Sequence, residues 1–178
     1  MEICETVEIV GMHGAFADEA AFDTWVRQTQ KPLVRFCRQF VGGWAEAEDM
    51  AQQAYLKAWE KRVSFRGKSS LLTWQMAIAR RVCLDFIRRR KTVELVSLED
   101  GEVARRSEFT NRSSDTCADV RQTLSELNAD DRAILYLRVG EEMPFGEVAR
   151  VLHCTPAAAR KRYERAKVRF ETIYSGKE

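Results

Sequence analysis

The stretch from Thr155 to Arg169, TPAAARKRYERAKVR, decides how the second half of this chain folds. Thr155 followed by Pro156 predicts a helix start, because a threonine hydroxyl caps free backbone amides and proline at the first helical position loses no hydrogen bond. A short apolar helix is expected immediately before it, over residues 145–152. Behind the start come six cations and one anion: Arg160, Lys161, Arg162, Arg165, Lys167 and Arg169, with Glu164. This order predicts a helix-turn-helix whose basic second helix can enter the major groove of DNA.

Charge alternates along the 178 residues, although the formal net charge is only +2. Residues 1–23 carry six acids and no Lys or Arg, and residues 93–119 carry seven acids and three bases. Residues 57–91 between them carry eleven bases and two acids. Such alternation indicates a chain that binds polyanions. Solvated helix faces are the alternative explanation, and it is weaker here because both basic segments adjoin aromatic residues or the helix-turn-helix.

Five cysteines, an odd and scattered set, do not form a disulfide framework. Cys37, Cys83 and Cys117 lie among apolar residues at helical spacing, so we expect them to be small core residues. No apolar run approaches the length of a membrane span, and the first residues lack the basic start and apolar core of a secretory signal. We therefore expect a cytoplasmic protein without direct membrane insertion.

Apolar residues recur at helical spacing from Asp18 to Lys91 and predict four helices. The first is expected over residues 18–30, and Pro32 is expected to open the second, which Gly42 and Gly43 close. The third is expected over residues 45–63 and the fourth over residues 70–91, with an exposed loop over residues 64–70.

From Thr92 to Asp115 the helical period disappears, and acids, Ser and Asn predict a flexible linker. Val120, Leu124 and Leu127 then mark a helix, and Asn128 is expected to cap the next one. The expected fold is all-α, with two small helical domains. Its parts are an acidic N-terminal tail (1–17), a four-helix domain (18–92), an acidic linker (93–117) and a helix-turn-helix domain (118–178).

Two sets of motifs, in this order, resemble the bacterial RNA polymerase sigma factors of the extracytoplasmic-function (ECF) group. In the first domain the motifs are AEDMAQ (47–52), LKAW (56–59), FRG (65–67), TW (73–74), IARR (78–81) and DFIRRR (85–90). In the second they are Leu127, Arg132, Leu135, Leu137, Arg138, Glu147, Val148, Ala149, Leu152 and Arg162. His153 departs from the family pattern, because it stands at a turn position commonly held by glycine and is expected to strain the bend.

The resemblance implies that the first domain docks on core RNA polymerase and melts the −10 element of promoter DNA, while the second reads the −35 duplex. Catalysis would belong to the polymerase, so the chain itself would not be an enzyme. The implied polymerase contacts are Glu48, Asp49, Gln52 and Leu56. Acids near a helix start also favour the helix dipole, which is an alternative explanation for Glu48. Trp59 is expected in the core rather than in this interface.

The loop over residues 64–70 and the helix after it combine hydroxyls, cations and aromatic rings, a mixture that suits single-stranded DNA. The resemblance implies that the loop holds a flipped base of the −10 element. Phe65 has an equal alternative as a hydrophobic plug beneath the loop, and Asp85 is expected to pair with Arg81 or Arg88. The candidate −10 contacts are Phe65, Arg66, Lys68, Ser69, Ser70, Trp74, Arg80, Arg81, Arg88 and Arg89.

The candidate −35 contacts lie at the start of the basic helix. Arg160 and Lys161 suit guanine, and Glu164 can accept a hydrogen bond from cytosine. Arg162 and Arg165 are expected to contact phosphates. The remaining candidate is Thr155. The residues of this helix that are expected to face the core, its inner stripe, are Ala159, Tyr163, Ala166 and Phe170.

Two other functions fit the same residues. One is a helix-turn-helix regulator that acts without polymerase, and the other is a decoy that mimics a sigma factor and sequesters its inhibitor. The resemblance also implies an anti-sigma factor as a partner. No nucleophile–base pair, phosphate-binding glycine loop or four-ligand metal pattern is evident, so we expect no cofactor and no metal.

Overall fold

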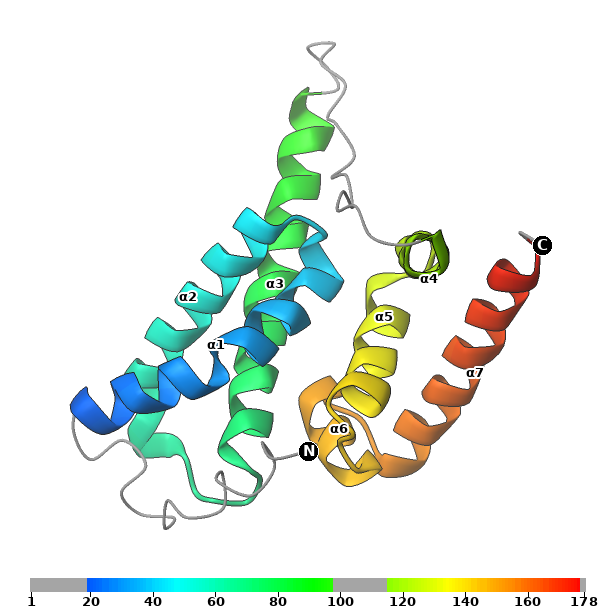
Figure 1. Cartoon of the computed structure of the whole chain (residues 1–178). Helices are drawn as coiled ribbons and strands as arrows, with labels where there is room; N and C mark the ends of the chain where they lie inside the picture. Colours follow the sequence, from blue (N-terminus) through cyan, green and yellow to red (C-terminus); the bar gives the residue numbers. More distant parts are fainter. Residues whose placement is uncertain (1–18, 98–114, 177–178) are drawn as a thin grey trace.

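The computed structural model describes residues 19–97 and 115–176, and its regular elements in both ranges are helices without a strand. Figure 1 shows two groups of helices side by side. The first holds α1 (Glu19–Val41), α2 (Trp44–Lys61), a short 3-10 turn η1 (Arg62–Ser64) and α3 (Leu71–Ser97). The second holds α4 (Asp115–Glu126), α5 (Ala129–Leu135), a π-helical turn η2 (Tyr136–Gly140), α6 (Phe145–Leu152) and α7 (Pro156–Ser175). The predicted all-α fold is confirmed.

One helix, α1, replaces the two helices expected on either side of Pro32. Proline inside a helix removes one backbone hydrogen bond, at a cost of about 3 kcal/mol. The buried stripe of α1 nevertheless continues through it, with Trp25, Leu33, Phe36 and Phe40 all buried. Each large apolar side chain contributes about 1.5–3 kcal/mol when buried, so packing outweighs the lost bond. The predicted helix break was wrong.

Cys37 of α1 and Cys83 of α3 lie fully buried in the core, as the sequence predicts. A hydrogen bond with Cys83 and burial raise the pKa of the Cys37 thiol well above its usual range, so Cys37 stays neutral. The side chain of Cys117 lies outside the described residues.

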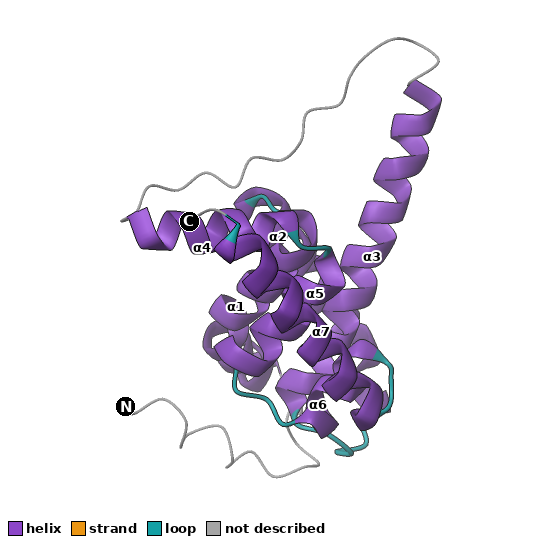
Figure 2. Ribbon diagram, turned by 90° about the vertical axis from the view of Figure 1, so that its right-hand side faces the viewer, coloured by secondary structure: helices purple, strands orange, loops and turns teal. Residues whose placement is uncertain are grey.

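Helix α3 runs to Ser97, beyond the end expected near Lys91, and its last turns project past the other helices (Figure 2). Residues 92–97 contain neither glycine nor proline, so nothing in this segment stops the helix.

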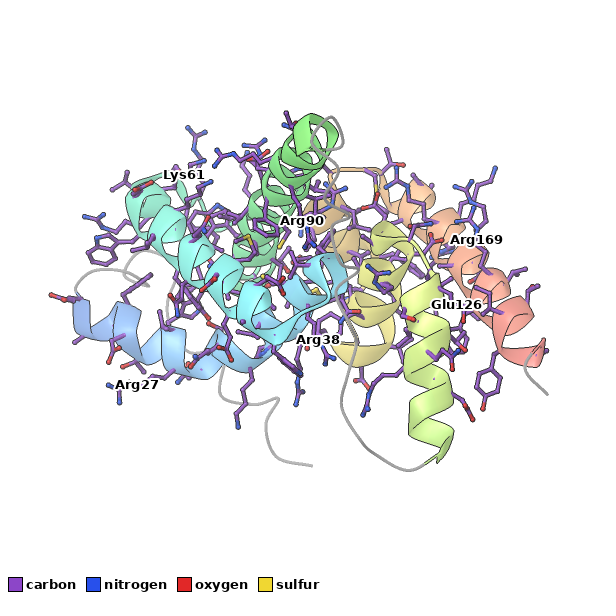
Figure 3. The ribbon with its side chains drawn as sticks, turned by 90° about the horizontal axis from the view of Figure 1, so that it is seen from above. Arg27, Arg38, Lys61, Arg90, Glu126 and Arg169 are labelled. Carbon is purple, nitrogen blue, oxygen red and sulfur yellow. The ribbon has the colours of Figure 1, made fainter. Side chains whose placement is uncertain are left out.

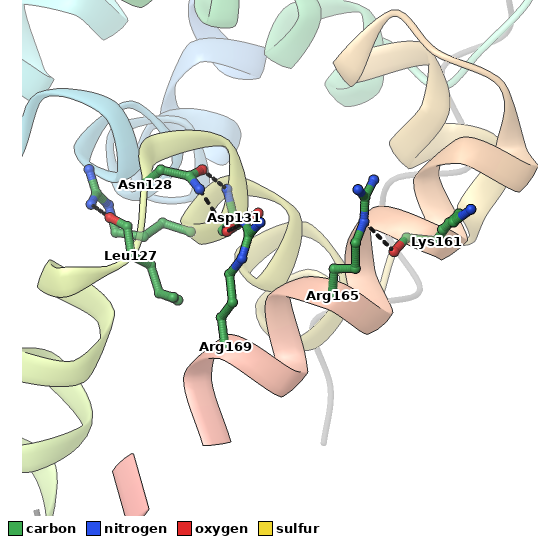
Figure 4. Close-up of polar contacts among 7 residues, drawn as sticks. Leu127, Asn128, Asp131, Lys161, Arg165 and Arg169 are labelled. Atoms are coloured by element: carbon green, nitrogen blue, oxygen red, sulfur yellow. Dashed lines mark hydrogen bonds and ion pairs between the residues drawn. The ribbon is translucent and has the colours of Figure 1, made fainter. Parts of the chain in front are cut away.

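The second group of helices is fixed at the start of α5 by polar contacts. The Asn128 side chain accepts a hydrogen bond from the Asp131 backbone amide at 2.9 Å, which confirms the predicted cap. The Asp131 carboxylate also pairs with Arg169 of α7 (Figure 4). This pair holds the two helices together where α5 begins.

The two groups of helices share one apolar core. Helix α1 contacts α5, and α3 contacts α6. Buried side chains from both groups, such as Phe36 and Ile134, belong to a single cluster. The sequence predicts two domains joined by a flexible linker, and it does not predict that the two groups of helices pack against each other.

Candidate nucleic-acid interface

The helix-turn-helix is built from α6 and α7. Thr155 caps α7, because its hydroxyl accepts a hydrogen bond from the Ala158 amide at 3.2 Å and Pro156 follows at the first helical position. His153 ends α6 with φ 52° and ψ 51°, the left-handed conformation that a side chain disfavours by about 1–2 kcal/mol. Both the predicted cap and the predicted strain at His153 are confirmed.

Helix α7 has one buried face and one solvent face. Ala159 and Ala166 are fully buried, and Tyr163 and Phe170 are half-buried beside them, as the predicted inner stripe requires. The Tyr163 ring packs edge-on against Phe145 of α6, with ring centroids 5.8 Å apart. This packing fixes which side of α7 remains available for DNA.

The solvent face of α7 carries the candidate base-reading residues. Arg160, Lys161, Glu164 and Arg165 are exposed, and Arg162 is half-buried. The Arg160 guanidinium lies 5.2 Å from the Phe145 ring centroid, which holds this side chain near the start of the helix. Glu164 pairs with Lys167 at 3.6 Å, and Arg165 Nε donates to the Lys161 carbonyl at 3.4 Å (Figure 4).

A row of arginines follows the solvent side of α3. Arg81, Arg88 and Arg89 are exposed, and Arg88 pairs with Asp85 at 3.4 Å, one of the two predicted partners. Arg90 lies on α3 alongside α2, within 3.9 Å of Glu46 (Figure 3). The exposed members of the row can follow a phosphate backbone.

Arg80 does not share this exposure. Its side chain is only 14% exposed, and its Nη2 lies 3.0 Å from Asp130 Oδ1 at the start of α5. The structure therefore separates Arg80 from the other candidate −10 arginines and places it against the second group of helices.

The loop between η1 and α3 carries aromatic, basic and hydroxyl groups. The half-buried Phe65 ring lies 5.2 Å from the Trp74 ring, while Arg66 and Lys68 are exposed. Ser69 is half-buried. Ser70 has a local role that the sequence reasoning missed, because its hydroxyl accepts a hydrogen bond from the Thr73 amide at 3.1 Å and caps α3.

A groove of about 310 Å³ lies between α2 and α3. Trp74 and Arg81 line it from α3, and Lys57 and Lys61 line it from α2. The two lysines were missed as site residues, although their spacing of four places them on one face of a helix. His153, from the turn of the helix-turn-helix, also borders this groove.

A separate acidic face lies on α2. Glu48, Asp49 and Gln52 are exposed, and Leu56 on the same side is 65% exposed. Trp59 follows Gln52 by seven residues and so lies on the same face of the helix, half-buried with its ring 4.9 Å from Phe22. That Trp59 belongs to the core rather than to this interface stays a prediction. An exposed leucine beside two acids suits contact with a protein better than contact with DNA, because the acids would repel phosphates.

Metal sites and membrane-spanning helices are both absent from the part of the chain that the structure describes. Residues 19–97 and 115–176 contain no cluster of three or more His, Cys, Asp or Glu side chains that could hold a metal ion. None of the described helices combines the length and the apolar character needed to span a membrane.

Comparison with known proteins places these features in a family. Residues 21–93 match the family model of sigma-70 region 2, and residues 117–170 match that of sigma-70 region 4. The chain is also 31% identical over 162 residues to the RNA polymerase sigma-H factor of Pseudomonas aeruginosa, covering 84% of each chain. The chain belongs to the sigma-70 family. Region 2 corresponds to α1–α3 and region 4 to α4–α7, in the order that the motifs predict.

A second relative is an ECF sigma factor, and a solved structure shares the fold. The chain is 26% identical over 200 residues to the ECF RNA polymerase sigma factor SigG of Mycobacterium tuberculosis, but it spans only 54% of that relative's length. The fold is shared with the sigma factor RpoE from Bartonella quintana, solved in complex with the anti-sigma factor NepR. That likeness has a TM-score of 0.71 and 24% identity, and it covers 86% of this chain and 96% of the other.

Proposed function

We propose that region 2 of this sigma factor docks on core RNA polymerase through the exposed face of α2 and captures the −10 strand with the 65–70 loop and α3. Region 4 then places α7 on the −35 duplex. One observation carries the proposal: neighbouring helices of region 2 expose an acidic, partly apolar face (Glu48, Asp49, Gln52 and Leu56) and a separate row of cations (Arg81, Arg88 and Arg89). Two faces of opposite charge suit two partners, one protein and one nucleic acid.

The protein partner is supported by Leu56. Burying a leucine side chain contributes about 1.5–3 kcal/mol, and this one is left 65% exposed beside Asp49 and Gln52. A basic groove on polymerase would cover the leucine and pair with the acid. The chain would act in the bacterial cytoplasm as a specificity subunit, and catalysis would remain with the polymerase.

The nucleic-acid partner in region 2 is supported by the groove between α2 and α3. Lys57, Lys61 and Arg81 supply three positive charges against the one carboxylate of Glu60, and Trp74 supplies an aromatic face. Stacking of an unpaired base on such a face is worth about 1–3 kcal/mol, which offsets part of the cost of opening the duplex.

Region 4 is supported as a duplex reader by the cap at Thr155 and by the exposed Arg160, Lys161, Glu164 and Arg165. A capped helix N-terminus that carries exposed cations fits the major groove. Arg162, which is half-buried, is placed better for a phosphate at the edge of the site.

An anti-sigma factor is the second protein partner that we propose. The related RpoE is solved in complex with such a factor. In this chain an inhibitor that covers Leu56 and Asp49 would exclude polymerase by direct competition.

Reconstitution with core polymerase tests the proposal. Run-off transcription from candidate promoters should require this chain, and Leu56→Ser should weaken binding to core polymerase about tenfold, the equivalent of one leucine side chain left unburied. Val63→Ser is the matched control, because Val63 is also strongly exposed in region 2 and lies outside the proposed face. Duplex binding without any effect on transcription would favour a regulator that acts alone. Binding to an anti-sigma factor without binding to polymerase would favour a decoy.

A further inference from the structure

We propose that Phe145, the first residue of α6, is a positioning residue for recognition of the −35 element. Its ring orients the Arg160 side chain of α7, so that Phe145 affects the choice of base without a contact of its own to DNA. This inference rests on the proposed function, because it takes α7 as the helix that reads the −35 duplex. It adds a residue of the neighbouring helix to the determinants of sequence specificity.

Two guanidinium groups lie over the Phe145 ring. Arg160 Cζ is 5.2 Å from the ring centroid, and Arg138 Cζ is 4.6 Å from it. An aromatic ring attracts a cation within about 6 Å of its centroid. Arg160 is exposed, whereas Arg138, Phe145 and Tyr163 are half-buried. The ring therefore connects an exposed charge on α7 to a framework that is packed within region 4.

The loop before α6 fixes the position of the ring. The Met143 amide donates to the Leu137 carbonyl at 2.9 Å, and the Arg138 guanidinium donates to the Met143 carbonyl. Met143 is itself buried. Phe145 follows two residues later, and its ring also packs edge-on against Tyr163 at 5.8 Å between centroids. The ring is thus held by its own backbone and by α7.

A fixed ring can favour one orientation of Arg160. An arginine that reads guanine must present two N–H groups to the edge of the base. An exposed arginine has many rotamers, and fixing one of them on binding costs entropy. The ring restricts Arg160 before DNA binds, and a guanidinium in contact with a ring face keeps the N–H groups on its edge available. The gain applies only at the base that Arg160 contacts, so it contributes to specificity rather than to general affinity.

Glu164 provides a comparison within the same helix. It pairs with Lys167 at 3.6 Å, and Lys167 Nζ lies 5.7 Å from the Tyr163 ring centroid. Glu164 is therefore held through Lys167, by groups that remain when the Phe145 ring is removed. A change at Phe145 should alter discrimination at the base that Arg160 reads and leave the base read by Glu164 nearly unaffected.

Competition binding of core polymerase carrying this chain, against singly substituted −35 duplexes, tests the proposal. The quantity measured is the discrimination, which is the affinity for the preferred duplex divided by that for the duplex altered where Arg160→Ala has its effect. Phe145→Leu and Phe145→Met both keep an apolar side chain and remove the ring. Each should lower the discrimination about twofold to fivefold, the range of one exposed cation–π contact. Phe145→Tyr keeps the ring and should retain the wild-type discrimination.

Two controls separate positioning from packing. Phe170→Leu makes the same change at another half-buried position, where the ring stacks on Tyr174 and lies about 15 Å along α7 from Arg160. This variant should leave the discrimination unchanged. When Arg160 is already replaced by alanine, Phe145→Leu should cause no further loss of discrimination, because the ring has no guanidinium left to orient.

Several results overturn the proposal. They are unchanged or higher discrimination without the ring, the same loss in Phe145→Tyr as in Phe145→Leu, a further loss when Arg160 is already alanine, or an equal loss of affinity for every duplex. An equal loss for every duplex would mean that Phe145 acts only in the folding of region 4.

Failure of the proposed function gives a different result. Polymerase carrying the wild-type chain would then bind all the −35 duplexes alike. If the wild type discriminates but Arg160→Ala weakens binding to every duplex equally, region 4 still reads the −35 element, and only the positioning role of Phe145 is overturned.

Discussion

The Tyr136 hydroxyl in region 4 lies 3.1 Å from the Pro32 carbonyl oxygen in the middle of α1. The same hydroxyl contacts the Glu141 carboxylate. Burial and the contact with Glu141 raise the pKa of Tyr136 far above its usual value, so this group remains a neutral donor. The residue that was expected to break α1 is therefore part of the surface to which region 4 binds.

Tyr136→Phe tests this contact. The variant keeps the ring beside Phe36 and removes the hydroxyl, whose single proton Pro32 and Glu141 share, so we expect the free energy of unfolding to fall by about 0.5–1.5 kcal/mol, the net contribution of a typical hydrogen bond. Urea denaturation followed by tryptophan fluorescence measures the change. Tyr174→Phe is the control, because the Tyr174 ring stacks on Phe170 near the end of α7, away from region 2. Equal losses in both variants would show that the hydroxyl contributes nothing at the interface.

Gln75 is a polar side chain in the core of region 2. It is 0% exposed, and neither its Nε2 nor its Oε1 has a hydrogen-bond partner among the described residues. Burying an amide without a partner costs about 1–3 kcal/mol, so Gln75→Met, which conserves the shape, should raise the free energy of unfolding by a similar amount. Thermal denaturation followed by circular dichroism measures this gain. A lower melting temperature would contradict the prediction.

The buried hydroxyl of Tyr55 should make the stability of region 2 depend on pH. Its hydroxyl lies 2.9 Å from the Thr29 hydroxyl, and burial raises the pKa of Tyr55 from 10 to about 12. Below pH 10 the folded and unfolded states both hold this proton, and above pH 10 the unfolded state loses it first. Stability is therefore retained up to about pH 10 and lost as the pH rises toward 12.

Between pH 8 and pH 11, ionisation of Tyr55 in the unfolded state should lower the free energy of unfolding by about 1 kcal/mol. Tyr55→Phe should be less stable at pH 8, because the hydroxyl's contacts with Thr29 and with the Val26 carbonyl are gone, but its free energy of unfolding should fall less between pH 8 and pH 11. Thr29 keeps its bond to the Trp25 carbonyl in this variant, so no buried donor is stranded. Parallel pH profiles for the variant and the wild type would rule out the assignment.

Local features of this fold could be predicted from the sequence, while contacts between distant residues could not. The caps at Asn128 and Thr155 depend on residues within three positions, and both were predicted correctly. The pairing of Arg88 with Asp85 is equally local. The contact between Arg80 and Asp130 joins residues fifty positions apart, and no pattern of spacing indicates it.

The error at Pro32 has the same origin. Proline predicts a helix break from local geometry, but the helix continues because Leu33 and Phe36 are buried against elements that are distant in the sequence. For the candidate site, the exposed arginines of α3 could be predicted from charge alone. The partial burial of Arg80 could not, because it depends on the position of region 4.

Arg160 and Arg165 of α7 should affect DNA binding in different ways. Arg160 is held beside Phe145 near the start of the helix, the end that would face base edges in the proposed placement of α7, whereas Arg165 lies more than a turn further along. We expect Arg160→Ala to weaken binding by about 1–3 kcal/mol at one or two base positions. We expect Arg165→Ala to weaken binding to all sequences and to reduce the slope of log affinity against log salt concentration by about one. Competition binding of polymerase containing each variant, against a set of singly substituted −35 duplexes at two salt concentrations, measures both effects. If Arg160→Ala reduces the affinity for every duplex equally, Arg160 contacts a phosphate, and base recognition must come from Lys161 or Glu164 instead.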